Sequence, residues 1–110
     1  ASKESLNNEE LIKEKFQGIR PAPGYPSCPD HRQKRDIWNL LDAEKCTGIS
    51  LTDSLAMWPT ASVSGFYFSH PEARYFQLGR IDKDQVQAYS KARNESIDEN
   101  EAWLAPVLGY

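Results

Sequence analysis

One short segment, GIRPAPGYPSCPDH at residues 18–31, combines residue types that could bind a small charged ligand. Four of the chain's seven prolines lie in it, so it favours neither a helix nor a central strand. Prolines hold such a backbone extended and leave its carbonyls and few remaining amides unpaired inside the segment. Arg20 adds a planar guanidinium that suits a carboxylate, and Tyr25 adds a ring face and a hydroxyl. Ala22 and Gly24 are small enough to let a flat ligand reach the backbone.

Two interpretations of this segment remain open. The first is a stiff connector between two helices. The second is a cradle for a small ligand that carries a carboxylate at one end and an aromatic ring at the other.

Other candidate chemistry rests on less specific patterns. Cys28 and His31 have C-x-x-H spacing, and Cys46 and His70 could complete a Cys2His2 zinc site, but the set contains only one close pair. We therefore expect two free thiols and no bound metal. The chain has no G-x-S-x-G elbow and no glycine-rich phosphate loop. We predict no catalytic residue in it.

The composition excludes several classes of protein. At 110 residues the chain forms one domain at most, and its net charge of -3 comes without a basic stripe, which argues against a nucleic-acid partner. No apolar run approaches the roughly 20 residues of a membrane span, and no signal peptide is visible. Two cysteines do not make a disulfide framework, which favours a cytoplasmic protein with reduced thiols. Because the chain begins with Ala1, we expect it to be an excised or processed segment.

Hydrophobic spacing and capping residues predict four helices. Their expected ranges are residues 9–16, 32–46, 82–92 and 96–104. The residues expected to cap or end them are Asn7 and Asn8, Gly18, Asp30, Asp82, and Ser96 with Glu99. The second helix would carry a broad apolar face that includes Ile37, Leu40 and Leu41, so we expect it to be well buried.

Three segments between these helices have the alternation and the aromatic content of strands. They are residues 49–57, 61–69 and 73–81, and the short link at residues 70–72 favours an antiparallel hairpin between the last two. The predicted fold class is therefore α+β, with an antiparallel β-sheet flanked by helices.

Three long motifs, in order, identify a family. They are GIRPAPGYPSCPDH, LTDSLAMWPTASVSGFYFSHPEARYF and WLAPVLGY, and the similarity runs from NEELIKEKFQGIRPAPGYP to the terminal LAPVLGY. In these the chain resembles the C-terminal activation domain of cobalamin-dependent methionine synthase, a methyltransferase. The resemblance implies that residues 1–110 are the C-terminal portion of that domain and share its fold.

The resemblance also implies a function. Activation domains of this family bind S-adenosylmethionine for the reductive remethylation of cob(II)alamin, which keeps the enzyme able to make methionine from homocysteine. The family's R-x-x-x-G-Y motif corresponds to Arg20, Gly24 and Tyr25. By resemblance, Arg20 meets the ligand carboxylate, Ala22 supplies backbone contacts and Tyr25 lies near the corrin. The pair Tyr75 and Phe76 resembles a second stretch that touches the ligand.

The expected partners follow from the same resemblance. They are the cobalamin-binding domain of the same enzyme and a flavodoxin-type electron donor. The sites for cobalamin, zinc, homocysteine and folate lie in other modules of the family. An acidic residue for the ligand's amino group belongs to an upstream portion, so we expect the fragment to be inactive alone. The alternative is a stand-alone ligand- or partner-binding module without turnover.

Overall fold

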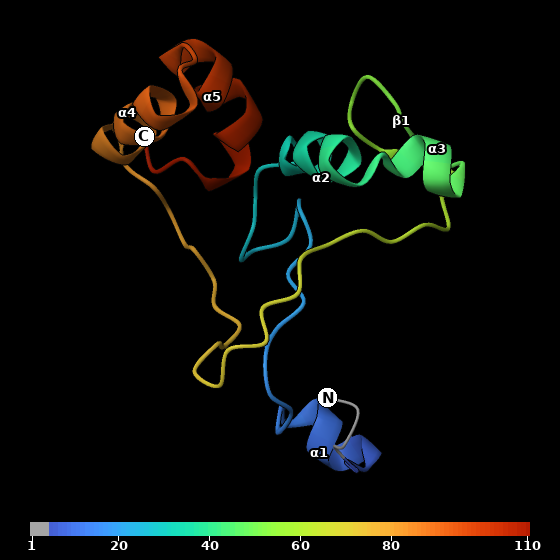
Figure 1. The fold of residues 1–110 in the computed structure, drawn as a ribbon. Helices are drawn as coiled ribbons and strands as arrows, with labels where there is room; N and C mark the ends of the chain where they lie inside the picture. Colours follow the sequence, from blue (N-terminus) through green and yellow to red (C-terminus); the bar gives the residue numbers. More distant parts are fainter. Residues whose placement is uncertain (1–4) are drawn as a thin grey trace.

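The structure is a computed structural model that describes residues 5–110. Its helices and strands are α1 (Asn8–Ile12), α2 (Gln33–Leu41), α3 (Ala43–Thr47), β1 (Ser50–Leu51), β2 (Met57–Trp58), α4 (Lys83–Arg93), α5 (Ile97–Leu104) and a final 3-10 turn (Ala105–Val107). Figure 1 shows α4 beside α5, α2 continuing into α3, and α1 standing apart. Two long irregular segments, drawn in blue and yellow, run side by side between these groups. These two segments form the candidate site.

The first helix is shorter than predicted. Asn7 caps it in a capping box with Glu10, as the sequence indicates, but α1 ends at Ile12 rather than at Phe16. Leu11 and Ile12 are exposed, so little packing stabilises a further turn, and short unpacked helices are marginal. The prediction that Gly18 ends this helix is wrong.

The predicted helix at residues 32–46 is two helices. Asp42 adopts a left-handed conformation, with φ 49° and ψ 47°, and it ends α2 and begins α3. The prediction that Asp30 caps α2 is wrong, because Arg32 occupies the N-cap position. The expected deep burial is also wrong for part of the apolar face: Ile37 is buried, whereas Leu40 is 87% exposed.

The two C-terminal helices agree with the prediction. Asp82 precedes α4, and its N–H donates to the Gln85 side chain at 2.8 Å. Ser96 precedes α5, and its hydroxyl accepts from the Glu99 N–H at 3.2 Å. A small apolar core joins these helices to the preceding and following chain. It consists of Ile81, Val86 and Leu104, packed against Tyr89, Ile97, Val107 and Leu108.

The α+β class with an antiparallel sheet is confirmed, but the sheet is smaller than predicted. Its two short strands, β1 and β2, pair Ser50 with Trp58 and Leu51 with Met57. Segments 61–69 and 73–81 carry only isolated bridges, so the predicted three-stranded sheet is wrong. Segment 61–69 pairs instead with the proline segment, where missing amide donors prevent a longer ladder.

Within residues 5–110, no helix combines the length and the apolar character that crossing a membrane requires.

Candidate ligand-binding site

The proline segment lies antiparallel to residues 66–68. The Ile19 N–H donates to the Phe68 carbonyl at 2.9 Å, and the Phe68 N–H returns a bond to Ile19 at 3.0 Å. The Phe66 N–H donates to the Pro21 carbonyl at 2.9 Å. Along this edge the segment is therefore paired with another part of the chain.

Two glycines allow this close approach. A Cβ atom at Gly18 would lie 2.5 Å from the Phe68 carbonyl oxygen, and one at Gly65 would lie 2.9 Å from the Pro21 carbonyl oxygen. Both distances are shorter than side-chain carbons tolerate. Glycine at these positions is thus a requirement of the pairing.

The opposite edge of the proline segment faces residues 75–77. In an extended chain, successive amides point to opposite sides, so Arg20 and Ala22 direct theirs away from Phe66 and Phe68. The Arg20 N–H donates to the Tyr75 hydroxyl at 2.8 Å. The Ala22 N–H has no hydrogen-bond partner among residues 5–110. It is a free donor beside the position of Arg20.

A tight turn follows Ala22. The Tyr25 N–H donates to the Ala22 carbonyl at 3.2 Å, and the Gly24 N–H donates to the Cys28 carbonyl at 2.8 Å. Gly24 has φ +97°, which favours glycine, and a Cβ atom there would overlap the His31 ring. The turn places Tyr25 at the surface, 66% exposed.

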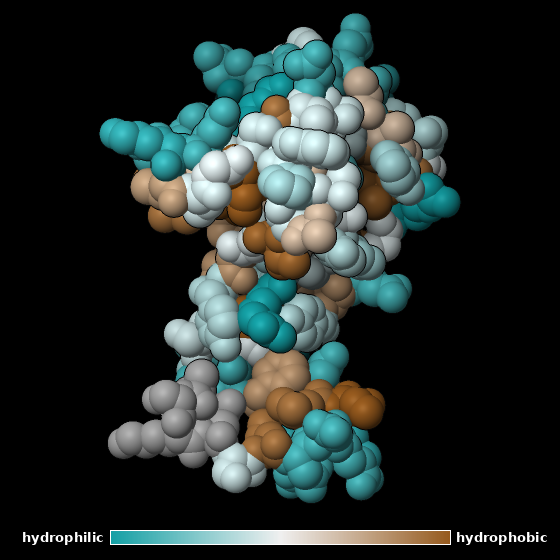
Figure 2. Space-filling view, turned by 90° about the vertical axis from the view of Figure 1, so that its right-hand side faces the viewer, coloured by the Kyte–Doolittle hydropathy of each residue, from teal (hydrophilic) through white to brown (hydrophobic). Residues whose placement is uncertain are grey.

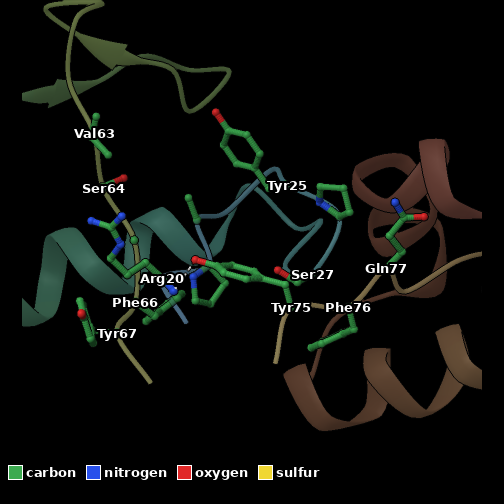
Figure 3. Close-up of a pocket in the computed structure, with 14 residues that line it drawn as sticks. Arg20, Tyr25, Ser27, Val63, Ser64, Phe66, Tyr67, Tyr75, Phe76 and Gln77 are labelled. Carbon is green, nitrogen blue, oxygen red and sulfur yellow. Dashed lines mark hydrogen bonds between the residues drawn. The ribbon is translucent and has the colours of Figure 1, made fainter. Parts of the chain in front are cut away.

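A cavity of about 850 Å³ lies between the proline segment and residues 63–67 and 75–77 (Figure 3). This volume is within the range of small-molecule sites. Five of the six predicted site residues line it, namely Arg20, Ala22, Tyr25, Tyr75 and Phe76. Gly24 does not line the cavity, but it forms the turn that holds Tyr25 there.

The wall combines aromatic rings with few polar groups. Phe66, Tyr67, Tyr75 and Phe76 contribute ring surfaces. Among the residues that the structure describes, the cavity wall includes the cation Arg20 and no carboxylate. Among the described residues, the Arg20 guanidinium has no ion-pair or hydrogen-bond partner, so it is available to an anion. This wall suits a ligand with an anionic group and a ring.

Three polar residues of the cavity wall are not indicated by the sequence, namely Ser27, Ser64 and Gln77. The Ser64 hydroxyl oxygen is buried and lacks a hydrogen-bond partner within the described chain. Buried polar atoms are usually satisfied, so an unpaired one in a cavity wall is a candidate ligand contact. In the sequence, a serine between valine and glycine looks like an ordinary strand residue. No sequence signal distinguishes such a strand serine from one that contacts a ligand.

A buried ionic cluster fixes the end of the proline segment to the C-terminal helices. Arg32, 1% exposed, pairs with Asp30 at 2.8 Å and with Glu95 at 2.7 Å, and also donates to Asn100. The Tyr89 hydroxyl donates to Asp30 at 2.7 Å. Burial alone would raise the pKa of Asp30, but the hydrogen bonds from Arg32 and Tyr89 outweigh it and lower that pKa.

The cysteines do not form a disulfide. Cys28 and Cys46 are both free thiols. Burial, followed by the nearby Asp30 charge, raises the pKa of Cys28, which makes its thiol a poor nucleophile. Across residues 5–110, no group of three or more histidine, cysteine or acidic side chains is arranged to hold a metal ion.

The chain is similar to proteins of one known family. Residues 1–94 match the family model described as the activation domain of vitamin B12-dependent methionine synthase. A crystal structure of the MetH reactivation domain bound to AdoHcy is 58% identical to this chain, with a TM-score of 0.92. The match covers 100% of this chain and 34% of that one, so the present chain spans about a third of its length.

Proposed function

This chain belongs to the family of activation domains of vitamin B12-dependent methionine synthases, and from that premise we propose that its cavity binds S-adenosylmethionine. One observation carries the proposal: five residues that the family resemblance assigns to the ligand line a single cavity of suitable size. The similar MetH structure holds AdoHcy, which differs from S-adenosylmethionine by the sulfonium methyl group.

Arg20 is the proposed anchor for the ligand carboxylate. Its guanidinium is exposed and free of partners within the described residues, and a guanidinium binds a carboxylate through two parallel hydrogen bonds. The free N–H of Ala22, on the same edge of the segment, is a second donor toward the ligand. Both groups are available without breaking an existing contact.

The aromatic wall suits the rest of the ligand. Tyr75 and Phe76 present ring surfaces, and the Tyr75 hydroxyl is fixed by its bond from the Arg20 N–H. Rings also attract cations, and a sulfonium is a cation. Tyr25, exposed at the wall, would border the corrin when the cobalamin-binding domain covers this face.

The proposed role is the reactivation of a methionine synthase. When bound, S-adenosylmethionine supplies a methyl group on a sulfonium for remethylation of cob(II)alamin, and a flavodoxin-type donor supplies the electron. The residues of this chain bind and orient the ligand. Cobalamin and zinc belong to other domains, so the chain contributes to methyl transfer only as part of the whole enzyme.

A binding titration at the protein's natural length tests the proposal. Replacing Arg20 with alanine removes a charge-assisted contact of about 1.5–3 kcal/mol, so S-adenosylmethionine affinity should fall roughly tenfold to 150-fold. Arg20→Lys should recover only part of the lost affinity, because a lysine ammonium cannot form the two parallel hydrogen bonds that a planar guanidinium forms with a carboxylate.

Arg74→Ala is the matched control. Arg74 is exposed, and its guanidinium bonds only the carbonyls of Pro71 and Ala73 within the described chain, so affinity should not change. An unchanged affinity of Arg20→Ala, together with a lower melting temperature of the ligand-free protein, would contradict the ligand role. The proline segment would then be a stiff connector.

A further inference from the structure

Lys34 is a buried cation without an acidic partner. Only 6% of it is exposed, and among residues 5–110 it forms no ion pair. Its ammonium donates to the Leu55 carbonyl at 2.7 Å and lies 3.0 Å from the His31 Nδ1 atom. Buried ammonium groups are costly unless they are paired, so this placement calls for an explanation.

The contact with Lys34 defines the state of His31. Burial lowers the pKa of Lys34. While its amine is charged it can only donate, so His31 Nδ1 then accepts, and the imidazole is neutral with its proton on Nε2. The same ring packs against Gly24, where a side-chain carbon would overlap it. A continuous set of contacts thus runs from the Leu55 carbonyl through Lys34 and His31 to Gly24.

Gly24 belongs to the turn that shapes the cavity. Its neighbours Ala22 and Tyr25 line the wall, and the turn closes through the bond from the Tyr25 N–H to the Ala22 carbonyl. A shift of the His31 ring would therefore move the turn, and with it the Ala22 amide and the Tyr25 ring.

We propose that His31 and Lys34 are positioning residues that hold the Ala22–Tyr25 turn in its ligand-binding form, and that only neutral His31 can do so. The proposal rests on the function proposed above and adds a regulation of the same site. Ligand affinity should therefore decrease in mildly acidic solution.

The surrounding charges set the direction of this effect. His31 is exposed overall, but partial desolvation of its ring and then the Lys34 charge lower the pKa of His31, while Asp30 acts in the opposite sense. The charge of Asp30 is already shared with Arg32 and the Tyr89 hydroxyl. Protonation would turn Nδ1 into a donor facing the Lys34 ammonium, which breaks the contact.

The test measures S-adenosylmethionine affinity between about pH 7 and about pH 5, a range in which the ligand carboxylate and amine keep their charges. The affinity of the unaltered protein for S-adenosylmethionine should fall by about threefold or more, because apparent affinity scales with the fraction of protein in the binding form, here the form with neutral His31. His31→Asn, whose amide oxygen can still accept from Lys34, should bind at pH 7 and show no loss in acid.

His70→Asn is the matched control. His70 is the chain's other histidine, exposed and bonded to the Glu72 N–H, so this variant should keep the full acid loss. His31→Ala and Lys34→Met should each weaken binding about tenfold at pH 7, as expected for losing a hydrogen bond with a charged partner. Melting curves recorded alongside show that each variant is folded.

Two outcomes would overturn the inference alone. One is a flat pH profile in a protein that binds the ligand, and the other is an acid loss that persists in His31→Asn. Absence of saturable binding by the unaltered protein at any pH would overturn the proposed function and this inference with it.

Discussion

At the scale of single residues, the candidate site depends on its glycines, which leave room for close contacts, as much as on its larger side chains. Gly65 lets the Pro21 carbonyl approach, and Gly24 accepts both a left-handed conformation and the His31 ring. The sequence marks out Arg20 and Tyr25 by residue type and by the family motif, and both line the cavity. Ser64 does not, because its importance arises only from an unpaired oxygen in a cavity wall.

Gly65→Ala tests the close approach. The new methyl would lie 2.9 Å from the Pro21 carbonyl oxygen, so the two paired segments must separate, at a cost of about 1–3 kcal/mol. Urea unfolding should show this loss, and S-adenosylmethionine affinity should fall as the cavity wall moves. Gly48→Ala, at a position with open space but φ +74°, should lose only some stability and no affinity. Equal affinities of the Gly65 variant and the unaltered protein would show that the close approach at Gly65 does not shape the binding cavity.

At the scale of elements, the local signals in the sequence predicted more than the long-range ones. The caps at Asn7, Asp82 and Ser96 act within three residues, and each begins the helix that it predicts. Segment 61–69 has the alternation of a strand, but its partner is a proline segment about 50 residues earlier in the chain. No local pattern in the sequence identifies that partner. The sequence alone therefore could not show that the prediction of a three-stranded sheet is wrong.

Arg32→Ala tests the link between the proline segment and helices α4 and α5. The substitution leaves Asp30 buried, 3% exposed, without its cation, which should destabilise the protein by about 3–5 kcal/mol. Urea unfolding measures the change. Arg35→Ala is the control, because Arg35 also lies over the Trp103 ring, at 6.0 Å, but is exposed. A loss as small as that of the control would contradict the role of the cluster.

The acid stability of the protein should reflect Asp30. Its pKa is lowered in the folded state, so its contribution is present above the unfolded pKa of about 3.9 and is lost as pH falls toward the folded value. The free energy of unfolding should therefore drop below about pH 4 in the unaltered protein. In Asp30→Asn that drop should be smaller, and an identical pH profile of the two proteins would show that Asp30 is not its cause.

At the scale of the whole molecule, the chain is extended for its size. Its radius of gyration is 16.3 Å, against about 13 Å for a compact domain of this length. Large apolar side chains lie at the surface, among them Val63 at 91% and Ile12 at 82% exposed. Figure 2 shows hydrophobic surface, in brown, at the lower end over α1.

The isolated chain of 110 residues should therefore self-associate. Exposed apolar surface of this kind drives association in water, and the short paired segments leave unpaired backbone edges. Light scattering over a range of concentrations should show a mass that rises above that of a monomer. A constant monomer mass up to the highest soluble concentration would contradict this expectation.

A crystal structure of the protein with S-adenosylmethionine would test the proposed binding site most directly. We expect ligand density in the cavity between the proline segment and residues 63–67 and 75–77, with the carboxylate at the Arg20 guanidinium and a polar atom at the Ala22 N–H. Ligand density at another surface, or an empty cavity at saturating ligand, would contradict it.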